Sequence, residues 1–118
     1  MERDRIYLID IVESAKRIES IIADLTRETF ERNETGQLAV LHLLTIIGEA
    51  SRRVSDTLRE SHVAHHFRSA IAMRNIIVHQ YDAVDLDVVW RTATVSVPKF
   101  REELEKMFGV EPNDSQTK

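Results

Sequence analysis

Two stretches of the 118-residue chain repeat apolar residues at alternating steps of three and four. The first runs from Leu8 to Leu25, and the second runs from Leu86 to Met107 and stays in phase for three heptads. This spacing places the apolar residues along one side of a helix and favours helices that pack side by side. We therefore predict one helix over residues 3–27, with Asp4 as a cap near its start, and another over residues 86–108.

Two further helices are predicted between these stretches, over residues 35–61 and 64–80. The first contains LAVLHLLTII, which is apolar nearly all round and must be buried on more than one side. The bundle core can cover one side, and a second copy of the chain is the simplest cover for the other. Polar links at residues 31–36, 61–66 and 82–85 separate the helices, and Asp85 is placed to cap the last one.

The ends of the last helix have their own signals. Pro98 stands inside the apolar seam, and because the seam keeps its phase on both sides we expect a bend and not two helices. Gly109 fits a helix stop, and residues 109–118 lack periodicity and read as a flexible tail. The prediction is an all-α domain over residues 3–108, folded as an antiparallel four-helix, up-and-down bundle.

Composition narrows the functional classes. The chain has three glycines, two prolines and no cysteine, which favours helices and excludes disulfides and thiolate metal sites. The net charge of −4 means that any contact with a nucleic acid has to come from a few placed arginines. The first residues are charged, and no apolar run approaches the ~18 residues that span a bilayer, so we expect a soluble, cytoplasmic protein without a membrane partner.

Arg74 is the most unusual residue of the third predicted helix. It falls on the same helical line as Phe67, Ala70 and Val78, where the pattern calls for an apolar side chain. A buried, unpaired guanidinium is costly, so Arg74 needs a carboxylate, a route to water, or a cleft that binds an anion. Glu49 of the preceding helix is the expected carboxylate. From the pattern alone, an ion pair that only fixes the register of the helices is as good an explanation as a binding site.

His79 and Tyr81 follow Arg74 closely. A histidine titrates near neutral pH and can serve as an acid or a base, and Asn75 stands one helical turn before it. Arg74 and His79 leave an ideal helix about 140° apart, so they converge only through a helix end near His79, the reach of the arginine stem, or a second chain that faces the first. The alternatives are a histidine that favours a helix C-terminus and a tyrosine that packs its ring and exposes its hydroxyl.

The other histidines point to no metal site. His62 and His66 share a helical face beside His65, but no carboxylate or cysteine completes a zinc set at ligand spacing. A polar link at a helix start is the better interpretation. His42, inside the apolar helix, is expected to be an interface residue and not a ligand.

Residues 74–81, RNIIVHQY, resemble the Arg-x4-His-x-Tyr motif of the HepT-like branch of the HEPN superfamily. The string LLTIIGEASRRVSD, the MRN around Arg74, and YDAVDLDVVWRT followed by VPKF are similar to that branch in order and spacing. The likeness covers about residues 4–108. It departs at Gln80, where relatives often have Asp, and at residues 65–67, HHF, where a Pro-Trp pair is common; neither change touches Arg74, His79 or Tyr81.

The resemblance implies a homodimeric helical bundle with two motif helices facing each other across a cleft. It implies a metal-independent endoribonuclease toxin without a cofactor, in which Arg74 and His79 are catalytic and Asn75 and Glu49 support them. It further implies a cognate MntA-like nucleotidyltransferase antitoxin that transfers AMP to Tyr81. RNA is then the substrate, the nucleotidyltransferase the partner, and a second copy of the chain the other half of the dimer.

Two other functions remain open from the sequence. The chain could be a non-catalytic HEPN partner subunit of a minimal nucleotidyltransferase, with a substrate-binding or regulatory role. It could also be a purely structural bundle, in which replacing Arg74 changes only stability.

Overall fold

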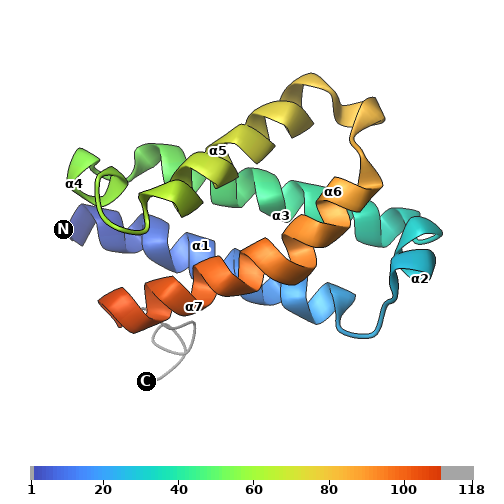
Figure 1. Cartoon of the computed structure of the whole chain (residues 1–118), viewed down its shortest axis with the longest axis horizontal. Coiled ribbons are helices and arrows are strands. Elements are labelled where there is room, and N and C mark those ends of the chain that lie inside the picture. Colours follow the sequence, from blue (N-terminus) through green and yellow to red (C-terminus); the bar gives the residue numbers. More distant parts are fainter. Residues whose placement is uncertain (1, 110–118) are drawn as a thin grey trace.

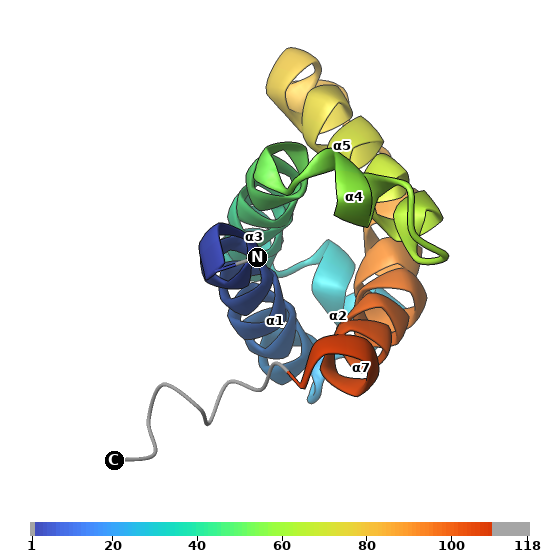
Figure 2. The same ribbon diagram turned by 90° about the vertical axis from the view of Figure 1, so that its left-hand side faces the viewer.

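The computed structural model describes residues 2–109, and all regular elements in that range are helical. Four long segments run alternately up and down (Figures 1 and 2). The α3 helix lies between α1 and α5, and the last segment packs against α1. The expected all-α, up-and-down bundle is confirmed. Its long segments are α1 (Glu2–Ile22), α3 (Glu34–Arg53), α5 (Ala64–His79) and the succession of α6 (Leu86–Arg91), the π-helical turn η2 (Thr92–Ser96) and α7 (Val97–Phe108).

The core follows the predicted apolar seams. Ile11 and Ile18 of α1 and Leu104 of α7 are completely buried, as the heptad spacing predicts. Leu25 and Met107, at the ends of the two seams, are only partly buried. The two stretches therefore form the centre of the bundle.

The first predicted helix is too long. The α1 helix ends at Ile22, and a short helix, α2 (Arg27–Glu31), follows it. Thr26 and Thr29 form a reciprocal capping box: the Thr26 hydroxyl accepts from the Thr29 N–H at 3.1 Å, and the Thr29 hydroxyl accepts from the Thr26 N–H at 2.8 Å. The short helix turns Phe30 fully into the core, where its ring lies 5.2 Å from that of Trp90.

The second predicted helix is also too long, and Asp4 is the reason. The α3 helix ends at Arg53, and Ser55 starts the short helix α4 (Asp56–Arg59). The buried Asp4 carboxylate accepts from the Ser55 N–H at 2.9 Å and from its hydroxyl at 2.7 Å. Asp4 thus fixes the break after α3, and the prediction that it caps its own helix is wrong.

The last segment is continuous through Pro98, as its seam predicts. The missing N–H of the proline is accommodated by the π turn, in which the Val97 N–H donates to the Thr92 carbonyl five residues earlier. Asp85 caps α6 by accepting from the Asp87 N–H at 2.9 Å, and Gly109 ends α7 in the left-handed conformation at φ 63°. The predicted flexible tail lies, beyond Gly109, outside the described residues.

The α5 helix has the predicted length, but its buried side is rotated from the predicted one. Met73 and Ile77 are buried with Phe67, whereas Val78 is 48% exposed. The helix packs against α3 on one side, and Phe67 and His66 contact Phe100 of α7 on another. The buried arc therefore lies toward both neighbours. The C-terminal half of α5 rises away from α6 (Figure 1).

Candidate functional site

Arg74 lies in the middle of α5, with its side chain pressed against α3 at Gly48. A Cβ atom at position 48 would overlap Cβ of Arg74 and would lie 2.8 Å from the carbonyl oxygen of Ala70. Only a glycine allows the two helices to approach this closely. Gly48 thereby determines where the Arg74 stem runs. The sequence signal for it is a glycine inside an otherwise apolar helix, which marks a close backbone approach.

The predicted ion pair between Arg74 and Glu49 is present. An Nη atom of Arg74 lies 2.5 Å from a Glu49 carboxylate oxygen, and its other Nη donates to Oδ1 of Asn75 at 2.9 Å. The Arg74 side chain is 21% exposed, and its Nε is buried without a hydrogen-bond partner. Two partners thus hold the guanidinium in a half-buried position, and its buried Nε–H is left without one.

Glu49 is shared by three arginines. Besides Arg74, it contacts Arg52 at 3.4 Å and Arg53 at 3.9 Å, one helical turn further along α3. Three guanidinium charges therefore surround one carboxylate, and this part of the surface has a surplus of positive charge although the chain as a whole is acidic.

His79 is the last residue of α5 and is exposed. The helix is regular up to this point, so the side chains of Arg74 and His79 leave its axis about 140° apart. Asn75, which stands one turn before His79, is bound to Arg74. A single chain holds the arginine against α3 and presents the imidazole on another side of α5.

Tyr81 begins the 3-10 turn η1 (Tyr81–Ala83) and is 54% exposed. It lies, with Val78, over the first half of α3, beside His42 and Leu38. These residues line a surface depression of about 490 Å³, completed by Leu41, Thr45 and Ile77. Tyr81 is therefore exposed beside α3, which is the helix that also packs against Arg74. The proximity of His42 to Tyr81 was not predictable, since it depends on how the two helices pack.

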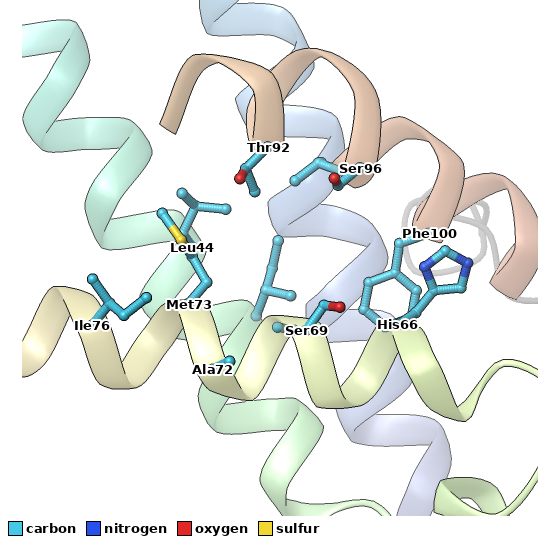
Figure 3. A pocket seen from close by; sticks show the side chains of 12 residues that line it. Leu44, His66, Ser69, Ala72, Met73, Ile76, Thr92, Ser96 and Phe100 are labelled. Carbon is cyan, nitrogen blue, oxygen red and sulfur yellow. The ribbon is translucent and has the colours of Figure 1, made fainter. Parts of the chain in front are cut away.

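A separate apolar pocket of about 250 Å³ lies between α5 and the last segment (Figure 3). The side chains of Leu44, Met73 and Ile76 form part of its wall, and Thr92 and Ser96 of the π turn face it. Neither Arg74 nor His79 lines it. This pocket was not predicted.

The histidines in the first turn of α5 pack against neighbouring rings. His66 stacks on Phe100, with ring centroids 5.1 Å apart, and its neighbour His65 lies 4.0 Å away. Burial lowers the pKa of His66, and the charge of His65 lowers it further. Among residues 2–109, no group of three or more histidine, aspartate or glutamate side chains has the arrangement to hold a metal ion.

Comparison with known proteins identifies the class. The profile of the family described as Ribonuclease HepT-like matches residues 11–107. "Putative RNase MJ1380" of Methanocaldococcus jannaschii is 33% identical over 99 residues, which are 84% of this chain and 91% of that protein. "Probable ribonuclease HepT" of Thermococcus cleftensis is 33% identical over 101 residues, which are 86% of this chain and 92% of that protein. The chain belongs to the HepT-like ribonuclease family.

No solved structure gives a significant match to the chain. Between residues 2 and 109, none of the helices has the length and apolar character that a membrane crossing requires.

Proposed function

We propose that the protein is an endoribonuclease toxin that cuts RNA with Arg74 and His79. The observation that carries this proposal is the placement of Arg74, which Gly48 and Glu49 hold on α5 five residues before an exposed histidine. Membership of a ribonuclease family supports the same function.

RNA supplies the nucleophile for this reaction. The ribose 2′-oxygen attacks the adjacent phosphorus while a base takes its proton, and the bond to the 5′-oxygen breaks as an acid protonates that oxygen. The products are a 2′,3′-cyclic phosphate and a 5′-hydroxyl. An imidazole suits the proton transfers, each worth ~10²–10⁴ in rate, and a fixed guanidinium stabilises the charge that builds on the phosphate. No step in this scheme requires a cofactor.

A homodimer would bring the two groups together. Within one chain, Arg74 and His79 lie on different sides of α5, so the imidazole of one subunit has to face the guanidinium of the other. Exposed apolar side chains at the end of α5 and the start of α3 support an interface there. The large apolar side chains exposed in this region are Leu38, Ile76, Val78 and Tyr81.

Tyr81 is the proposed site of inhibition. An MntA-like nucleotidyltransferase would transfer AMP from ATP to the tyrosine hydroxyl, with release of pyrophosphate. Tyr81 is exposed and stands seven residues after Arg74, so the added phosphate would repel RNA and its adenosine would occupy the approach to the proposed cleft. Mass spectrometry of the chain co-expressed with the nucleotidyltransferase should find AMP on Tyr81, and the Tyr81→Phe variant should stay unmodified and toxic.

The cleavage proposal is tested by incubating the purified chain with RNA in EDTA. Wild-type protein should cut, leaving cyclic phosphate ends, and His79→Ala should lose the activity while His62→Ala, an exposed histidine elsewhere, keeps it. Absence of cleavage at all protein concentrations, together with tight binding to the nucleotidyltransferase, would instead establish the non-catalytic partner subunit.

A further inference from the structure

A polar hollow of about 620 Å³ lies at the end of the bundle where α1 starts and α3 ends. Four arginines line it, and we call it the arginine pocket: Arg3, Arg52, Arg53 and Arg59, together with Tyr7. Its acidic lining residues are Asp4 and Asp56. The Asp4 carboxylate is buried and accepts two hydrogen bonds from Ser55, and with Asp56 it sets two negative charges against the four arginines. The pocket thus has a surplus of positive charge in an acidic chain.

These arginines are loosely held. The Arg59 contact to Asp56 is 3.7 Å long, and Arg52 and Arg53 approach Glu49 no closer than 3.4 and 3.9 Å. Their side chains are 40%, 47% and 63% exposed, respectively. Because a guanidinium has five N–H donors in a planar fork, such arginines keep donors available for an anion from outside the chain.

The pocket is continuous with the surroundings of Arg74. Tyr7 and Arg53 also line the neighbouring depression, which contains Glu49, the partner of Arg74. One helical turn, about 6 Å, separates Arg53 from Glu49 along α3. Asp10 lines this second depression and adds one negative charge beside the surplus of arginines. A chain of phosphates could therefore pass from Arg74 into the pocket without leaving the surface of α3.

We propose that the arginine pocket binds the phosphate backbone of single-stranded RNA, next to the nucleotides that are cut. The inference rests on the proposed ribonuclease function and names where the substrate is held. Guanidinium groups bind phosphates in a bidentate manner, and Tyr7 offers a ring against which a base can stack. RNA binding by a chain of net charge −4 requires a local cluster of this kind.

The test measures binding without cleavage, in chains that all carry His79→Ala. The anisotropy of a labelled single-stranded oligonucleotide is followed at several salt concentrations. The pocket variant is Arg3→Gln/Arg59→Gln, because neither residue contacts Glu49. The matched control is Arg17→Gln/Arg91→Gln, which removes the same charge from two exposed arginines outside the pocket.

The pocket variant should bind at least about tenfold more weakly, and the slope of log K against log salt should become smaller by about 1.4, since each lost phosphate contact of a single strand contributes about 0.7. The control variant should bind nearly as well as the parent. Equal binding by the pocket variant and its control would overturn the proposal, and so would a pocket variant that binds RNA normally but no longer binds the nucleotidyltransferase. The chain with His79 restored is also tested for cleavage. If it cuts no RNA although binding still depends on the pocket, the ribonuclease function is refuted and the RNA-binding role of the pocket is retained.

Discussion

Arg74 and Arg101 both join two long helices, but the charges around them are opposite. Arg101 of α7 binds both oxygens of Glu19 on α1, at 2.6 and 3.1 Å, and binds Glu105 at 2.9 Å, with Glu102 at 3.8 Å. Glu19 and Glu105 raise the pKa of Arg101, the hydrogen bond to Glu19 most of all. Arg74 has one carboxylate, which two other arginines share.

The difference separates a structural ion pair from a site that can take an external anion. Around Arg101 the negative charges are in surplus and its three nitrogens are all engaged, so an incoming phosphate would be repelled. Around Arg74 the positive charges are in surplus, because three guanidinium groups share one carboxylate. The number of carboxylates and guanidinium groups around an interhelical arginine therefore distinguishes the two kinds of site.

The largest expected effect is on catalysis at Arg74. Arg74→Ala should lower kcat/KM for RNA by about 10²–10³, because it removes a fixed donor to the developing charge. Arg74→Lys keeps the charge but lacks the planar fork, and should recover only part of the rate. Unchanged cleavage with a lowered melting temperature would make Arg74 a structural residue like Arg101.

Gly48→Ala should have the next largest effect. The added methyl group overlaps the Arg74 stem and the α5 backbone, so it should cost about 1–3 kcal/mol of stability and reduce cleavage in the protein that remains folded. Gly36→Ala is the comparison in the same helix, because its methyl group meets only Asn33, which caps the start of α3 by accepting from the Gly36 N–H at 2.8 Å, and leaves the Arg74 stem untouched. Urea unfolding and RNA cleavage measured on both variants give the result. Equal stability and activity of the two would show that the close approach at Gly48 is not required.

Arg101→Gln should change stability and leave chemistry intact. The loss of its charged hydrogen bonds to Glu19 and Glu105 should cost about 1–2 kcal/mol, measured by urea unfolding. Cleavage per folded molecule should equal that of the wild type. A specific loss of activity at unchanged stability would break the distinction between the two arginines.

The smallest effect is expected at His66, which lies outside both arginine sites. Its lowered pKa in the fold means that the unfolded chain binds more protons below the ordinary histidine pKa of about 6.5, so stability should fall as the pH drops from 7.5 to 5.5. His66→Phe keeps a ring against Phe100 and should flatten this dependence, whereas His62→Gln should not. The unfolding midpoint in urea at each pH checks this. A slope that His66→Phe leaves unchanged would assign the pH dependence to other groups.

The long helices were predictable because they depend on the spacing of apolar residues along the chain. The Arg74–Glu49 pair was predictable because an arginine on an apolar face needs a carboxylate partner. The ends of α1 at Ile22 and of α3 at Arg53 were not predicted. The end of α3 depends on a contact between Asp4 and Ser55, which are 51 residues apart in the sequence. The rotation of α5 that exposes Val78 arises from packing against two neighbours at once. The catalytic roles of Arg74 and His79, and the modification of Tyr81, stay predictions, because they need an assembly with a second copy, RNA or the nucleotidyltransferase.

The sharing of Glu49 has a consequence for how a phosphate could be received. If Arg74 turned from Glu49 to a substrate oxygen, the carboxylate would still have Arg52 and Arg53 within 4 Å. Glu49 would not be left as an unpaired anion in a partly buried position, so the usual free-energy penalty for breaking an ion pair would be small. The guanidinium can therefore exchange a carboxylate oxygen for a phosphate oxygen without leaving Glu49 unpaired.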